Sequence, residues 1–340
     1  VEYEFEWGDT DSVAYAQNFR GGAINFDNPS ATGAETSSEV GWRLRFEAAS
    51  EADVGPARAI IQLEEDGADD IQFTQAYVQI GDQTVLSAGL KGTLYSTAHS
   101  GAYNNLLGLF STMATGGPGT GSGHVIQLET TVAEGIAISA GLEGLDGTIR
   151  GVGVVEVDGD WGEGHLSLAV DENGAWKTHA GVQFSFDSFD LRTAVAADDT
   201  GFWNALVTGQ AEFDLFTLSA GVQYAEGGGF DPQWGAGAQI GADVTDTVAI
   251  NLGSRYLTNT VTSEEIWQVA LGTEVDLTDN LGLEAEIGYV SSTYATAGDD
   301  FAYAEAELEY SPGGGATATL GAEFNTTGAW QATFGLEKSF

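Results

Sequence analysis

The chain has 340 residues, no cysteine, and 51 acidic against 10 basic residues, which gives a formal net charge of −41. This acidic excess excludes nucleic-acid binding, because phosphate contacts need a basic surface. The lack of cysteine excludes a disulfide framework and any cysteine-based metal site. Hydrophobic residues make up 42% of the chain and aromatic residues 11%, so the charge does not indicate disorder.

Short segments in which apolar and polar residues alternate follow one another along the chain. Trp42, Leu44 and Phe46, for example, alternate with Arg43 and Arg45. A period of two indicates a β-strand, because successive side chains point to opposite faces. The segments that fit this pattern, 20 in number, lie at 2–7, 40–47, 58–64, 71–81, 84–94, 123–132, 135–143, 149–158, 162–170, 175–187, 189–197, 203–214, 216–225, 233–244, 247–258, 265–276, 281–290, 301–310, 316–324 and 329–340.

Short and long connections alternate between these segments. Residues 187–188 and 245–246 form tight turns, whereas 9–38 and 95–122 are the two longest connections. Tight turns on one side of a sheet and longer loops on the other are typical of outer-membrane barrels. With an even strand number, both chain ends are expected on the short-turn side.

So many strands with no helical domain between them need a closed sheet if no edge is to stay free. An apolar outside and a polar inside are typical of a transmembrane β-barrel. We therefore predict an all-β fold, a closed antiparallel transmembrane β-barrel of about 16 to 20 strands, built from residues 1–340 as a single domain. A soluble all-β binding protein and a barrel enzyme are the alternatives from other classes. No catalytic residue is predicted, since none of the four histidines lies in a local nucleophile motif.

Two stretches resemble the trimeric porins of alpha-proteobacterial outer membranes. They are 73–81, which reads FTQAYVQIG, and 329–340, which ends on the aromatic Phe340. The resemblance implies a homotrimer, and it implies that the long connection after the fifth strand, 95–122, folds into the barrel and constricts the pore. An outside loop that touches a neighbouring subunit is the alternative for 95–122. The chain departs from the family in its larger strand number and in a loop 95–122 that has no Asp or Glu.

Passive diffusion of small hydrophilic solutes and ions through a water-filled channel is the function that this resemblance implies. Basic side chains on the polar faces of nearby strands would form a cationic ladder on one wall, and ion pairs with the inward carboxylates beside them are the alternative. The negative net charge predicts a preference for cations. A substrate-selective channel is the alternative within the same architecture. The predicted pore-lining and constriction residues are Arg43, Arg45, Arg58, Lys91, Glu47, Glu64, His99, Tyr103 and Asn104.

Clusters of carboxylates in the loops are candidate Ca²⁺ sites, because this hard cation takes several oxygen ligands. They comprise Asp66, Asp69, Asp70, Asp198, Asp199, Asp299 and Asp300. No cofactor is expected to be required. We expect a mature chain whose export signal has been removed, located in the bacterial outer membrane in contact with lipid and lipopolysaccharide.

Overall fold

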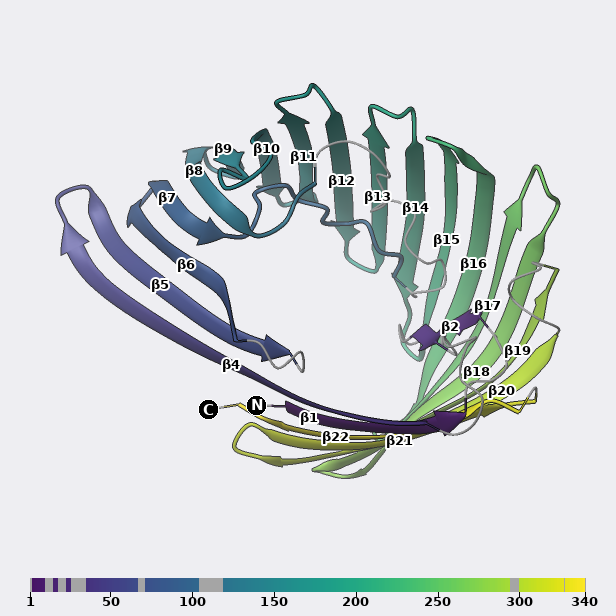
Figure 1. The fold of residues 1–340 in the computed structure, drawn as a ribbon. Coiled ribbons are helices and arrows are strands. Elements are labelled where there is room, and N and C mark those ends of the chain that lie inside the picture. The colour runs from purple at the N-terminus through teal and green to yellow at the C-terminus, as the bar shows by residue number, and fades with distance from the viewer. Residues whose placement is uncertain are drawn as a thin grey trace.

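The computed structural model describes residues 2–9, 15–17, 23–25, 35–66, 71–103, 119–293, 300–326 and 328–339. Within these ranges the chain is built from β-strands, and 20 of them form one antiparallel sheet (Figure 1). The sheet strands are β1 (Glu2–Asp9), β4 (Glu35–Ala52), β5 (Gly55–Asp66), β6 (Gln72–Gly81), β7 (Thr84–Lys91), β8 (Gly123–Ala133), β9 (Ile136–Glu143), β10 (Arg150–Gly159), β11 (Gly162–Asp171), β12 (Trp176–Phe186), β13 (Phe189–Asp198), β14 (Trp203–Glu212), β15 (Phe216–Gly227), β16 (Phe230–Thr245), β17 (Val248–Asn259), β18 (Glu265–Thr278), β19 (Leu281–Ser292), β20 (Phe301–Gly313), β21 (Ala316–Asn325) and β22 (Trp330–Lys338). A separate hairpin joins β2 (Tyr15–Gln17) to β3 (Ala23–Asn25).

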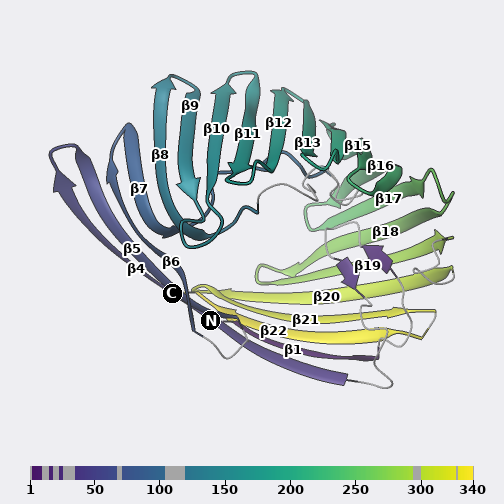
Figure 2. The ribbon, with the colours of Figure 1, turned by 45° about the horizontal axis from the view of Figure 1, so that its top comes forward.

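Strand pairing follows the chain order from β4 to β22, with β1 between the two ends. In the register, Glu2 of β1 lies opposite Gly41 of β4 on one side and opposite Glu337 of β22 on the other. Every strand of the sheet therefore has a hydrogen-bonded neighbour on both sides (Figure 2). Each of the 20 strands predicted from the sequence coincides with one strand of this sheet. No helix among the described residues is long and apolar enough to cross a membrane.

The connections differ at the two ends of the strands, as predicted. At one end the turns are as short as 82–83, 187–188 and 246–247. At the other end the chain makes longer connections, among them 260–264 and the stretch between β7 and β8. β1 starts, and β22 finishes, at the short-turn end.

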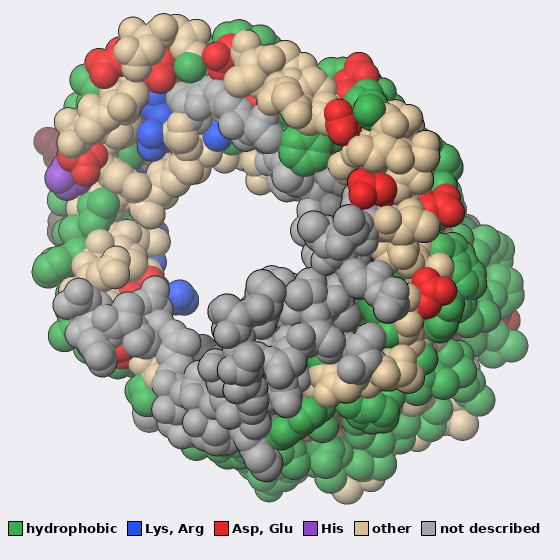
Figure 3. Space-filling model, turned by 45° about the vertical axis from the view of Figure 1, so that its right-hand side comes forward, with side chains coloured by type: hydrophobic (Ala, Val, Ile, Leu, Met, Phe, Trp, Pro, Cys, Tyr) green, Lys and Arg blue, Asp and Glu red, His purple; other side chains and the backbone are tan. Residues whose placement is uncertain are grey.

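One face of the sheet is apolar and exposed, and the other surrounds an open centre (Figure 3). Leu44 and Leu336 keep about half of their surface exposed, at 50% and 48%, and Phe334 keeps 39%. These side chains are therefore not packed in a dry interior. The outward apolar rows predicted from the sequence are confirmed at these positions.

Aromatic side chains gather at both ends of the strands. Near the longer connections, outward-facing Trp and Tyr rings pair on neighbouring strands, with centroid distances of 5.1 Å (Trp203–Tyr224), 5.2 Å (Trp234–Tyr256) and 6.4 Å (Trp267–Tyr289). At the short turns, Phe rings pair at 6.2 Å (Phe186–Phe189) and 4.6 Å (Phe213–Phe216). Girdles of this kind mark the two membrane interfaces of a barrel.

Candidate functional site

The basic residues predicted to form a ladder lie on the inner face of β4, β5 and β7. The charges of three of them are offset by neighbouring carboxylates. Arg43 forms an ion pair with Glu64, and an Nη atom of Arg58 lies 3.6 Å from Glu47. The Lys91 ammonium lies 2.7 Å from a carboxylate oxygen of Glu129, which the sequence analysis did not single out.

Arg45 differs from these three bases because its hydrogen bonds go to amides. Its guanidinium donates to the side-chain oxygen of Gln75 at 3.0 Å and to that of Gln62 at 3.4 Å. Neutral acceptors leave the positive charge of Arg45 uncompensated by these contacts.

Carboxylates line the inner face of β19, β20 and β21, which are separated from β4 by β22 and β1. In the register, Glu284 of β19 lies opposite Glu307 of β20. One step along the strands, Glu305 of β20 lies between Glu286 of β19 and Glu323 of β21. Acidic side chains thus stand beside one another across neighbouring strands, while the bases of β4–β7 stand on another arc.

The stretch that follows β7 enters the ring of strands. The buried carboxylate of Glu143 on β9 accepts hydrogen bonds from the Leu94 amide at 2.7 Å and from the Thr93 hydroxyl at 2.6 Å. The Gln127 side chain on β8 donates to the Gly92 carbonyl at 2.8 Å. We call residues 92–103 the inner segment.

The middle of the inner segment packs on β10, β11 and β12. Tyr95 forms a small apolar cluster with Val152, Val154 and Ala169. The Lys177 ammonium lies 5.3 Å from the centroid of the Tyr95 ring, a cation–π distance. The Ser96 amide donates to the Ser167 hydroxyl at 3.0 Å. Burial in this cluster raises the pKa of Tyr95.

The inner segment is held at its far end by β13 and β14. Arg192 donates to the Gly101 carbonyl at 3.0 Å, and its guanidinium carbon lies 4.4 Å from the centroid of the Tyr103 ring. The Tyr103 amide donates to the Thr208 hydroxyl at 3.4 Å. The inner segment therefore contacts each strand from β8 to β14, and it runs around the inside of the wall. Figures 1 and 2 show this path in front of β10–β14.

His99 and Tyr103, two of the predicted constriction residues, both lie in the inner segment. His99 has a left-handed backbone with φ of 61°, and its Nδ1 atom lies 3.9 Å from Glu163. Its ring stands 5.6 Å from that of His165 on β11. The third predicted loop residue, Asn104, lies outside the described residues.

Sequence reasoning missed the side chains that hold the inner segment. Glu143, Ser167, Lys177 and Arg192 all occupy inward positions of their strands. Because they are polar and alternate with apolar residues, the sequence places them on the polar face, but no local motif connects them to residues 92–103. Their contacts with the inner segment depend on the path of that segment, and the alternation within the strands does not predict this path.

The candidate calcium residues that can be described accept hydrogen bonds from their own loop or from a neighbouring strand. Asp198 accepts hydrogen bonds from the amide and the hydroxyl of Thr200, and Asp199 accepts one from the Trp176 amide. Asp300 accepts one from the Tyr289 hydroxyl at 2.9 Å. Asp69, Asp70 and Asp299, and the side chain of Asp66, lie outside the described part of the chain. Among the described residues, no group of three or more His, Asp or Glu is arranged to hold a metal ion.

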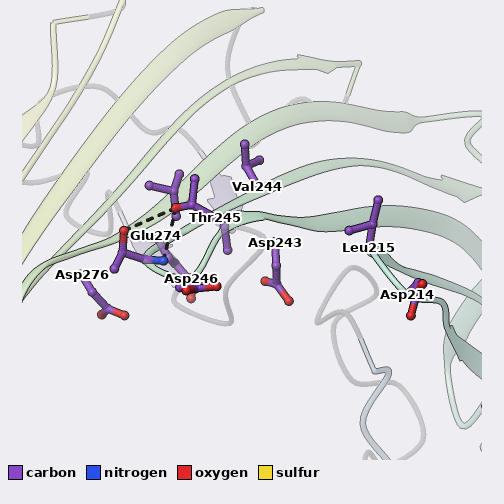
Figure 4. A pocket seen from close by; sticks show the side chains of 11 residues that line it. Asp214, Leu215, Asp243, Val244, Thr245, Asp246, Glu274 and Asp276 are labelled. Carbon is purple, nitrogen blue, oxygen red and sulfur yellow. Dashed lines mark hydrogen bonds between the residues drawn. The ribbon is translucent and has the colours of Figure 1, made fainter.

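A further set of carboxylates surrounds a pocket at the short-turn end of β14–β18 (Figure 4). Its lining includes Asp214, Asp243, Asp246, Glu274 and Asp276. Negative charge thus gathers at this mouth as well as along the acidic arc of the wall. Such charge raises the local concentration of cations.

The profile of the Porin subfamily matches residues 1–315 of the chain. The chain belongs to this porin family. The match confirms the porin resemblance drawn from the two sequence stretches. Family and fold together indicate a channel and not an enzyme.

Solved structures similar to this porin include a mutant of the Rh. blastica porin, with 12% identity and a TM-score of 0.44 over 100% of this chain and 98% of that chain. The anion-selective porin from Comamonas acidovorans has 14% identity and a TM-score of 0.42 over 100% and 99%. OccK11 (OpdR) of Pseudomonas aeruginosa has 12% identity and a TM-score of 0.53 over 98% and 93%, which supports a common fold. No curated protein sequence matches this porin.

Proposed function

We propose that this porin forms a closed barrel in the bacterial outer membrane and lets small hydrophilic solutes and ions diffuse passively through a water-filled channel. The inner segment and the rest of 95–122 narrow that channel. The observation that carries the proposal is the set of contacts between residues 92–103 and the inner side of β8–β14, opposite an exposed apolar outer face. Strand pairing on both sides of every sheet strand supports closure.

Transport of ions is tested in planar lipid bilayers with purified protein. We expect discrete current steps of uniform size, and a current that no single sugar or amino acid blocks in a concentration-dependent way. Saturable block by one solute would instead indicate a substrate-selective channel.

A preference for cations is the second part of the proposal. It is supported by the net charge of −41, by the rows of Glu on β19–β21 and by the carboxylates around the short-turn mouth. The bases of β4, β5 and β7 oppose it, although three of them are paired with carboxylates. Reversal potentials in a salt gradient decide the question, and a clear anion preference would refute this part.

The proposal also covers the oligomeric state of the porin and its contacts with the membrane. By its family the porin is a homotrimer, and its apolar outer face with two aromatic girdles suits membrane lipid and lipopolysaccharide. Ca²⁺ bound by loop carboxylates would link it to anionic lipid or to another subunit. The molar mass in detergent, measured by light scattering with and without a chelator, tests both the trimer and the role of Ca²⁺.

A further inference from the structure

Three histidines meet where the inner segment lies on β11 and β12. His165 Nε2 and His179 Nδ1 are 2.8 Å apart, and their rings are stacked with centroids at 5.0 Å. The His99 ring approaches His165 from the inner segment, at 5.6 Å. The strand register brings the first two together, since His165 lies opposite Gly181, two residues from His179.

This histidine cluster is closely covered by the inner segment. His165 and His179 are only 7% and 1% exposed. A Cβ atom on Gly181 would lie 2.6 Å from the Ala98 carbonyl oxygen and 2.8 Å from His165. The wall and the segment therefore touch here with no room for water between them. Added charge cannot be hydrated unless the segment moves away.

The hydrogen bond between His165 and His179 limits how many protons the pair can hold. One ring nitrogen must donate and the other must accept, so at least one ring has to stay neutral. When both rings are protonated, two donors and two positive charges face each other at the same place. The contact then becomes repulsive.

Other charged groups around the cluster have both signs. Glu163 pairs with His99, and Glu156 of β10 lies opposite His165 in the register. Arg192, Lys177 and Asp190 stand on the neighbouring inward positions of β12 and β13. The two glutamates favour a first proton, whereas the two bases oppose a second. Burial lowers the pKa of His99, with Glu163 acting in the opposite direction, so the docked segment is favoured at neutral pH and loses stability as the pH falls.

We propose that protonation of the His99, His165 and His179 cluster releases residues 96–103 from the wall, so that the channel conducts less in acid. The inference rests on the proposed function of the inner segment as the constriction. The wall occupies one side of the segment, which contacts the inner face of β10–β14, so a released segment moves toward the centre of the ring and into the path of the ions.

Single-channel recording tests this proposal between about pH 7.5 and about pH 4.5, the range in which histidine takes up a proton. We expect the unmodified porin to lose current in acid. The double variant His165→Gln and His179→Gln keeps an amide hydrogen bond without a titrating ring, so it should keep its current. His124→Gln is the matched control, because His124 is an exposed residue on the outward side of β8 and its loss should leave the acid response unchanged. An equal acid response in the double variant and the control would overturn the proposal.

A tether gives an independent test, because the chain has no cysteine of its own. Ser96→Cys together with Ser167→Cys would join the segment to the wall where their amide and hydroxyl now hydrogen-bond at 3.0 Å. We expect the oxidised form to keep its current in acid and the reduced form to lose it. Acid closure of the oxidised, cross-linked form would contradict release of the segment. If no channel forms even at neutral pH, the proposed function fails, whereas a channel with the same current at both pH values defeats this inference alone.

Discussion

The Glu143 carboxylate on β9 accepts a 2.7 Å hydrogen bond from the backbone amide of Leu94. The same buried carboxylate also accepts from Thr93 and Gln127, and Arg150 lies 3.7 Å away. A single side chain thus fixes the point at which the polypeptide leaves β7 and turns into the ring of strands. Without it, two donors of the chain entering the inner segment would be buried and unpaired.

Replacement of Glu143 by Ala should loosen the inner segment and destabilise the fold by about 1–3 kcal/mol, the cost of leaving buried donors unsatisfied. Glu143→Gln is the matched variant, since its amide oxygen still accepts from Leu94, and it should cost less. Heat unfolding in detergent followed by circular dichroism measures the stability, and current noise reports the segment. Equal midpoints for Glu143→Ala and the unmodified porin would show that the contact is not needed.

Arg192 should limit the motion of the far end of the inner segment, near Gly101 and Tyr103. Arg192→Met removes the hydrogen bond to Gly101 and the cation over the Tyr103 ring, while Arg192→Lys keeps a cation there. Cation–π contacts and hydrogen bonds are each worth about 1 kcal/mol, so the docked state should lose part of its population. We expect more open-channel current fluctuation in Arg192→Met than in Arg192→Lys. Identical noise in both variants would refute this role.

A new charge should destabilise the fold far more at one of two neighbouring positions on β16 than at the other. Ile240 lies on the outer face and is 42% exposed, whereas Gln239 points inward. Ile240 lies between the two aromatic girdles and nearer the short-turn one, so Arg there should cost part of the about 2–4 kcal/mol that Arg costs at the middle of the bilayer. Gln239→Arg places the same charge in water and should cost much less. Folding yield in lipid vesicles, titrated with urea, compares the two. Equal stability would mean that the outer face does not contact lipid.

Glu284 and Glu307 should contribute to ion preference because their carboxylates lie opposite each other on the inner wall. The double variant Glu284→Gln and Glu307→Gln removes two negative charges at nearly constant size. We expect its reversal potential in a salt gradient to shift toward anions. A double Gln variant of Glu226 and Glu265, which bind outward-facing Tyr hydroxyls, is the control and should leave the potential unchanged. A shift in the control alone would contradict the assignment of the inner wall.

The number and position of the strands could be predicted from the sequence because burial differs on the two faces of each strand. Leu44 and Phe46 flank Arg45, and this local alternation is retained in the structure. The connections, long and short, could be predicted as well, because they are the stretches in which the alternation of apolar and polar residues is lost.

The contacts of the inner wall could not be predicted in the same way. The pairing of Arg43 with Glu64 and of His165 with His179 depends on how far one strand is shifted against the next. Sequence periodicity fixes the face of a residue but not its partner across the strand. The path of 92–103 along β8–β14 depends on many such contacts at once, so the anchoring by Glu143 became visible only in three dimensions.

The claim that the polar face encloses water and the apolar face meets lipid is tested most directly at two adjacent residues of β21. Thr319 points inward, and Leu320, which is 55% exposed, points outward. Each is replaced by Cys in turn, and the porin in a lipid bilayer is treated with a charged, water-soluble thiol reagent. We expect Thr319→Cys to react and its channel current to fall, while Leu320→Cys stays unmodified and its current unchanged. Reaction at Leu320→Cys with none at Thr319→Cys would contradict the account.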